Sequence, residues 1–184
     1  MPVLVPAADL PGLVAARLRE RSGTSWVGVD GFGAAGKTTL AAALARALPG
    51  AAVVHVDDFA RPSVQGWERD RFVEQVLVPP AAGRAARYQR WDWGSDTGAE
   101  WHDVPPGVPV VVEGVSSTDV RLAVPWDVQV WVEAGREVRL ARALARDGAA
   151  MMEQWLTDWM PSEERYAADQ RPRERADYCV RTSS

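Results

Sequence analysis

A lysine, two threonines and three glycines lie close together in residues 30–44, DGFGAAGKTTLAAAL. The segment from Gly31 to Thr38 fits the pattern G-x-x-x-x-G-K-[ST], between an apolar stretch and an alanine-rich helix. Glycines let such a loop fold back with its N–H groups inward, and the following helix adds the positive end of its dipole. The spacing therefore predicts a P-loop, which binds the phosphates of a nucleotide.

The positions of this loop have distinct expected roles. Lys37 is expected to reach the β- and γ-phosphates of ATP, and the Thr38 hydroxyl to bind Mg²⁺. The predicted ATP-binding residues are Gly31, Gly33, Ala34, Ala35, Gly36, Lys37, Thr38 and Thr39.

Acidic residues end three apolar segments: VGVD at Asp30, VHVDD at Asp57 and Asp58, and VVVE at Glu113. One such acid would mean little, because exposed loops are polar. The carboxyl ends of parallel strands share one edge of a sheet, however, where ligands bind. We expect Glu113 to hold Mg²⁺ with Thr38 and Asp57 to act as a base toward an acceptor hydroxyl. Asp58 is expected to be a solvated neighbour, and Asp30 to brace the loop through backbone hydrogen bonds.

The segment REVRLARALAR places Arg139, Arg142 and Arg146 within an arc of about 60° on a helix. A solvated helix face is one interpretation of this pattern. Beside a P-loop a second interpretation is favoured, because phosphoryl transfer needs positive charge over the transferring group. We therefore expect Arg142 and Arg146 to be catalytic residues of a lid that spans about residues 136–160.

Apolar runs and helical spacing predict the elements that position these residues. Strands are expected at 26–30, 52–56, 109–113, 128–132 and 177–180. Helices are expected at 9–21, 36–48, 67–78, 136–146 and 151–170, the last with a break at Pro161, whereas 81–107 is expected to be irregular. This alternation predicts one α/β domain over 1–184, a P-loop NTPase three-layer fold with a mostly parallel five-stranded sheet and helices on both faces.

The composition is that of an ordinary globular protein. The chain has 184 residues and a net charge of −4, with a pI near 5.3, which argues against nucleic acid as a partner. Cys179 is the single cysteine, and the start of the chain has no basic signal-peptide region. We expect a cytoplasmic protein without a membrane span; whether it forms a homo-oligomer is left open.

Five segments resemble the uridine kinase and phosphoribulokinase family of P-loop kinases: DGFGAAGKTT, VVHVDDFARP, WDWGSDTG, VVVEGV and WVEAGREVRLARALARDG. The resemblance runs from Trp26 to Val180. It implies a nucleoside-kinase-like fold, ATP and Mg²⁺ as cofactors, and a small hydroxylated acceptor. It also implies that Asp57 is the catalytic base, that Arg142 and Arg146 lie near the phosphates, and that the WDW segment and Arg139 contact the acceptor.

The chain departs from that family in two places. Asp96 stands near the position of a histidine that uridine kinases use on the base, and Trp67 stands where a sugar-binding acid is expected. The chain is also shorter than typical members, so we expect an abbreviated loop on the adenine side. The predicted acceptor-binding residues are Asp57, Trp67, Trp91, Asp92, Asp96 and Arg139. The tryptophans either stack on a flat acceptor or belong to the core.

The sequence thus predicts an ATP-dependent phosphotransferase that moves the γ-phosphoryl group to a hydroxyl of a nucleoside or a related small molecule. A kinase for a sugar, vitamin or antibiotic is an alternative. A nucleotide-binding regulator or ATPase that transfers nothing is a second alternative.

Overall fold

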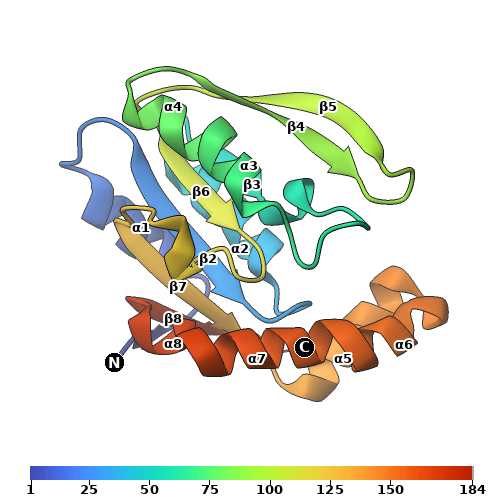
Figure 1. Cartoon of the computed structure of the whole chain (residues 1–184). Coiled ribbons are helices and arrows are strands. Elements are labelled where there is room, and N and C mark those ends of the chain that lie inside the picture. Colours follow the sequence, from blue (N-terminus) through green and yellow to red (C-terminus); the bar gives the residue numbers. More distant parts are fainter. Residues whose placement is uncertain (184) are drawn as a thin grey trace.

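A central sheet of six strands organises the chain in the computed structural model, which describes residues 1–183 (Figure 1). The strands are β1 (Val3–Val5), β2 (Ser25–Gly31), β3 (Ala52–His55), β6 (Pro109–Glu113), β7 (Val128–Glu133) and β8 (Tyr178–Arg181). Their order is β1-β8-β7-β2-β6-β3, and neighbouring strands pair in parallel. The predicted α/β fold with a parallel sheet is confirmed, with six strands in place of five.

The additional strand is β1, which lies at the edge of the sheet and pairs with β8 over three residues. Its side chains Val3 and Leu4 are 58% and 61% exposed. Its sequence is an apolar run of only three residues, VLV, between Pro2 and Pro6, which is too short for a periodic pattern to predict a strand.

Helices cover both faces of the sheet, as predicted. Val111 points into a core shared with α1 (Leu10–Leu18) and α2 (Lys37–Ala47). Val110 and Val112 point into the opposite core, with Phe72 and Tyr88. Because successive side chains of a strand point to opposite faces, a continuous run of valines fills both cores.

The other helical segments are α3 (Arg69–Phe72), α4 (Val78–Ala81), α5 (Arg136–Asp147), α6 (Met152–Gln154), α7 (Met160–Gln170) and α8 (Pro172–Arg175). Between them lie the 3₁₀ turns η1 (Val56–Phe59), η3 (Val120–Leu122) and η4 (Ala149–Met151) and the π turns η2 (Val73–Leu77) and η5 (Trp155–Trp159). In Figure 1, α5 and α7 cross below the carboxyl ends of the strands. Among residues 1–183, no helix combines the length and apolar character that crossing a bilayer requires.

Two prolines are accommodated in ways that the sequence analysis missed. The helix expected at 67–78 was expected to stop before Pro79, and the one at 151–170 to break at Pro161, but helical backbone continues through both prolines. Each lies in the first turn of a new α-helix, just after a π turn in which an N–H bonds to the C=O five residues earlier, as in Met160 N–H to Trp155 C=O. The π turn removes the need for the N–H that proline lacks.

The expectation of irregular structure at 81–107 was wrong. An antiparallel hairpin forms there from β4 (Ala86–Asp92) and β5 (Thr97–Val104), drawn above the sheet in Figure 1. Tyr88 is buried while Arg87 is exposed, so the strand alternates as a half-buried strand should. A bulge between Gln89 and Trp91 interrupts that alternation and conceals it in the sequence.

Candidate active site

The strand order brings the predicted site residues to one edge. β6 lies between β2 and β3, and Glu113 at its end is in register with Val29 and His55. The loop after β2, the turn η1 after β3 and the end of β6 are therefore neighbours at the carboxyl edge, where ligands bind in such sheets.

The loop from Gly31 to Thr38 has the backbone that its glycines predict. Gly31 has a φ of 150°, and a Cβ there would collide with the carbonyl oxygen of Val132. Gly36, with a φ of 97°, is the N-cap of α2. Ala34 also has a positive φ, of 58°. The loop thus turns sharply into the N-terminus of α2, the geometry in which backbone N–H groups bind phosphate.

Lys37 and Thr38 begin α2. The Lys37 ammonium is buried and donates to the carbonyl oxygen of Phe32 at 2.9 Å, so it lies folded over the loop. The Thr38 hydroxyl donates to Glu113 Oε1 at 3.1 Å. His55 Nδ1 lies 2.5 Å from the same oxygen, and this hydrogen bond raises the pKa of His55.

Thr38 and Glu113 fit the predicted Mg²⁺ site. Neighbouring ligands of octahedral Mg²⁺, bound at about 2.1 Å, lie roughly 3 Å apart, close to the 3.1 Å between Thr38 Oγ1 and Glu113 Oε1. Within residues 1–183 no cluster of three His, Cys, Asp or Glu side chains is placed to hold a metal. The remaining ligands would be water and phosphate oxygens, which is usual for Mg²⁺ at nucleotide sites.

Asp30 is a buried acceptor that joins three segments. It accepts from the N–H groups of Gly31, Ser116 and Thr118, from the Thr118 hydroxyl and from the Tyr166 hydroxyl. The expectation that Asp30 braces the loop through backbone hydrogen bonds is confirmed, and Asp30 also anchors α7 through Tyr166.

The two aspartates of η1 have different environments. Asp57 is exposed, although the surrounding protein raises its pKa chiefly by desolvation, against the opposing charge of Lys37. Asp58 is buried and accepts a hydrogen bond from Tyr88 Oη at 3.0 Å. The expectation that Asp58 is a solvated neighbour was wrong, because the hairpin covers it. Asp57 is the member of the pair that a ligand can reach.

Helix α5 turns one arginine, Arg139, inward, whereas Arg146 near its C-terminal end is exposed. Arg139 is 4% exposed, whereas Leu144 on the same helix is 48% exposed. The buried face of α5 thus combines Arg139 with the apolar Ala143, whereas the buried face of an amphipathic helix is usually apolar throughout. The Arg139 guanidinium lies 4.5 Å over the ring of Phe32 in the loop and pairs with Glu163. Arg146 pairs with Asp147, and its charge acts on Asp57. The inward face is suited to an anion.

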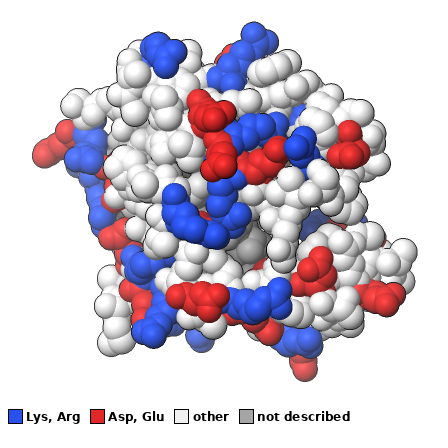
Figure 2. All heavy atoms as spheres, in the orientation of Figure 1, with Lys and Arg blue, Asp and Glu red and all other residues white. Residues whose placement is uncertain are grey.

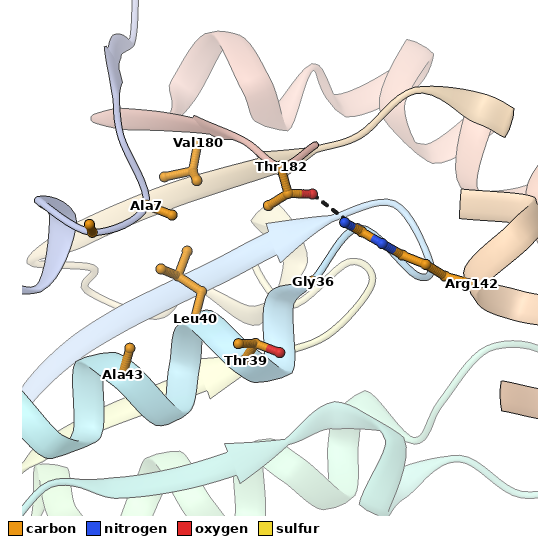
Figure 3. Close-up of a pocket in the computed structure, with 9 residues that line it drawn as sticks. Ala7, Gly36, Thr39, Leu40, Ala43, Arg142, Val180 and Thr182 are labelled. Carbon is orange, nitrogen blue, oxygen red and sulfur yellow. Dashed lines mark hydrogen bonds between the residues drawn. The ribbon is translucent and has the colours of Figure 1, made fainter. Parts of the chain in front are cut away.

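Arg142 lies on the other side of the loop. It donates to the carbonyl oxygen of Ala34 at 3.2 Å and to the Thr182 hydroxyl at 3.0 Å. It lines a pocket of about 520 Å³, shown in Figure 3, whose lining residues are Ala7, Ala8, Gly36, Thr39, Leu40, Ala43, Arg142, Val180 and Thr182. The predicted ATP-binding residues Gly36 and Thr39 thus line a pocket that continues from the loop.

The predicted acceptor-binding residues lie in different environments. Trp67 is buried, contacts Phe59 and Phe72, and donates to Ser116 Oγ. Trp91 lies on the hairpin, under the guanidinium of Arg61, and donates to Asp96.

Asp92 caps the hairpin turn by accepting from the N–H groups of Gly94 and Ser95. Asp96 lies in the same exposed turn, with a φ of 51°. The structure therefore places Trp67 in the core and the other three on the hairpin, while Arg139 lies against Phe32 in the loop of residues 31–38.

Several side chains around the loop were not expected from the sequence. Glu163 of α7 accepts from the Gly33 N–H at 3.0 Å, and the Trp155 ring covers Gly33. Ala7 and Thr182 line the pocket beside Gly36. These residues belong to no motif and come from distant parts of the chain, so only the tertiary structure brings them to the loop.

Charged side chains of both signs surround this region. Figure 2 shows Lys and Arg side chains in the middle of the face, between the hairpin and α7, with Asp and Glu beside them. Attraction of an anionic ligand therefore depends on the buried cations Lys37 and Arg139 more than on a broad positive field.

Comparisons with known proteins establish the fold. No protein-family model matches the chain, and no curated protein does. The structure is similar to a possible uridine kinase from Bacillus stearothermophilus, with a TM-score of 0.66 and 17% identity over 94% of this chain and 98% of that chain. It is also similar to a candidate fructose transport system kinase from Silicibacter sp. TM1040, with a TM-score of 0.59 and 22% identity over 97% and 100% of the two chains. The chain has the α/β fold of these proteins, as the motif resemblance predicted.

Proposed function

We propose that the protein is a kinase that transfers the γ-phosphoryl group of ATP to a hydroxyl group of a small molecule. The position of Asp57 carries this proposal. Asp57 is exposed in η1, just after β3, and the charges of Lys37 and Arg146 act on its carboxylate. A base that adjoins the cations of a phosphate site can receive the proton of an acceptor hydroxyl.

The pocket of Figure 3 is suited to the base and ribose of the nucleotide. Its walls are apolar at Ala7, Leu40 and Val180, and Thr39 and Thr182 supply hydroxyl groups. Its volume of about 520 Å³ lies within the range of small-molecule sites. A nucleotide seated there extends from Gly36 along the loop, so its outermost phosphate lies toward Gly33 and Asp57.

The transfer step follows from this placement. The acceptor oxygen bonds to the γ-phosphorus while the bond from that phosphorus to the β–γ bridging oxygen breaks, and ADP leaves. The acceptor's proton moves to an Asp57 carboxylate oxygen. Lys37, Arg146 and the loop N–H groups stabilise the charge on the transferring group. Thr38 and Glu113 would hold Mg²⁺, which would supply further neutralisation of the phosphate oxygens.

The hairpin β4–β5 forms the acceptor side in this proposal. β4 packs against η1, which carries Asp57. Trp91, Asp92 and Asp96 lie toward the turn of that hairpin, where Trp91 offers a flat ring and the acids offer acceptors for hydroxyl groups. The names uridine kinase and fructose transport system kinase, borne by the two similar proteins, support a kinase and make nucleosides and sugars the first acceptors to test.

A screen of ATP consumption tests the proposal. The full chain is incubated with Mg-ATP and individual nucleosides, sugars or vitamins, and ADP and phosphorylated product are measured. A kinase forms one molecule of ADP for each molecule of acceptor that it phosphorylates, and does so with one of the compounds tested. Slow ATP hydrolysis that no acceptor stimulates would instead indicate the nucleotide-dependent regulator.

A further inference from the structure

The phosphate loop already holds an anion that belongs to the protein. Glu163 Oε2 accepts from the Gly33 N–H at 3.0 Å and from Arg139 Nη1 at 3.1 Å, and both side chains are buried. A Cβ on Gly33 would lie 2.5 Å from Glu163 Oε1 and 2.6 Å from the Trp155 ring. The residue at position 33 must therefore lack a side chain while Glu163 and Trp155 rest on the loop.

Arg139 is incompletely satisfied by Glu163. Its Nε is buried and has no hydrogen-bond partner among the residues that the structure describes. A guanidinium presents its N–H groups as a fork, which matches two oxygens of one phosphate. The site around Arg139 is thus built for an anion with more oxygens than the single carboxylate oxygen that now contacts it.

We propose that Glu163 is a positioning residue that occupies the seat of the γ-phosphate in the nucleotide-free protein and exchanges with that phosphate when ATP binds. This inference rests on the proposed function. Without nucleotide, Glu163 holds the Gly33 N–H and Arg139 in place. With ATP bound, the γ-phosphate takes both groups and also satisfies Arg139 Nε.

The surroundings identify the seat as that of the outermost phosphate. Gly36 and Thr39 line the pocket proposed for the base, whereas Gly33 lies at the start of the loop. Burial raises the pKa of Glu163, whereas the positive charge of Lys37 opposes this shift and favours the ionised carboxylate. A negative group at this point therefore meets the loop N–H, Arg139 and Lys37 together, as a γ-phosphate would.

The anchoring of α7 limits which part can move in the proposed exchange. Tyr166 Oη donates to Asp30 at 2.6 Å, and Gln170 donates to Asp119 at 2.9 Å. These bonds tie the C-terminal part of α7 to the rest of the fold. Glu163 lies one turn before Tyr166, so its side chain and the preceding segment with Trp155 leave the loop while the far end of α7 stays in place.

Calorimetric titration of the full chain with Mg-ATP and Mg-ADP tests the exchange. Glu163→Gln removes the competing charge and keeps the side-chain size. We expect it to tighten ATP by about tenfold, which equals ~1.4 kcal/mol, and to change ADP much less, because ADP has no γ-phosphate. The KM for ATP should fall by a similar factor while kcat stays near the wild-type value, since Glu163 is already displaced at saturating ATP.

Glu164→Gln is the matched control, because it removes the same charge from an exposed neighbour on α7. It should leave both affinities unchanged. Glu163→Asp, one methylene shorter, should tighten ATP binding in the same way but by a smaller factor. It provides the test of the exchange if Glu163→Gln does not fold. Unchanged or equally weakened binding of ATP and ADP in these Glu163 variants would overturn the exchange. Failure of the wild-type chain to bind ATP would instead contradict the proposed kinase function.

Discussion

Replacing Asp30 tests whether the loop is held as the structure indicates. Asp30 accepts five hydrogen bonds: from three N–H groups at 2.7 Å, 2.9 Å and 3.1 Å, and from two hydroxyl groups at 2.7 Å and 2.6 Å. In Asp30→Asn, the amide oxygen can take the place of Oδ1 and keep the N–H groups of Gly31 and Ser116. The amide nitrogen then faces Thr118 and Tyr166, whose hydroxyls can rotate to accept from it.

The Thr118 N–H cannot rotate in this way and loses its acceptor. One orphaned buried donor, with the loss of charge assistance in the other bonds, lowers the free energy of unfolding by roughly 2–3 kcal/mol. For a chain of this size, such a loss corresponds to a fall in Tm of roughly 4–12 °C. Tyr166→Phe removes one of the five charge-assisted bonds and should cost about 1.5 kcal/mol.

Thermal and urea unfolding, followed by circular dichroism, measure both variants. The predicted order of stability is wild type, then Tyr166→Phe, then Asp30→Asn. An Asp30→Asn variant within about 0.5 kcal/mol of wild type, the usual range for surface changes, would refute the reasoning. So would a larger loss in Tyr166→Phe than in Asp30→Asn.

Three further predictions concern the site. Lys37→Ala should abolish phosphoryl transfer and weaken ATP binding in calorimetry while the chain stays folded; unchanged affinity would contradict the P-loop assignment. Because the pKa of Asp57 is raised and the base must be deprotonated, kcat/KM should fall as pH falls, with an inflection above the ordinary value of about 3.9 for aspartate. The pKa of His55 is raised as well, so His55→Gln is the control. The fall in kcat/KM at low pH should persist in this variant, and its disappearance would mean that it arises from His55. Asp92→Ala should raise the KM for the acceptor far more than the KM for ATP, and equal effects would assign Asp92 to the structure of the hairpin turn alone.

Much of the fold is predictable because its strands are buried on both faces. Runs such as VVVE at the end of β6 fill two cores at once, so they appear as uninterrupted apolar segments. The hairpin could not be predicted in the same way. It is half-exposed and carries a bulge at Gln89–Trp91, so its alternation is broken where the strand is most polar.

The site is predictable where its residues are neighbours in the sequence. The spacing from Gly31 to Thr38 determines the loop, and the end of β3 determines the place of Asp57. The direction of a side chain depends on what packs against it, which explains why Asp58 was misjudged: Tyr88, thirty residues later, covers it. The helical arc of the arginines was visible, but the burial of Arg139 alone among them depends on its contacts with Phe32 and Glu163.

The most direct test of the central claim is the rate of acceptor phosphorylation by Asp57→Asn. This change keeps the shape of the side chain and removes its basicity. Transfer to the identified acceptor should fall by ~10²–10⁴-fold, the usual contribution of a general base, while the affinity for Mg-ATP stays near that of wild type. Asp58→Asn, measured beside it, should lose stability through its bond to Tyr88 and retain most of its transfer rate. Near-normal transfer in Asp57→Asn, or a greater loss of transfer in folded Asp58→Asn, would contradict the assignment of Asp57 as the base.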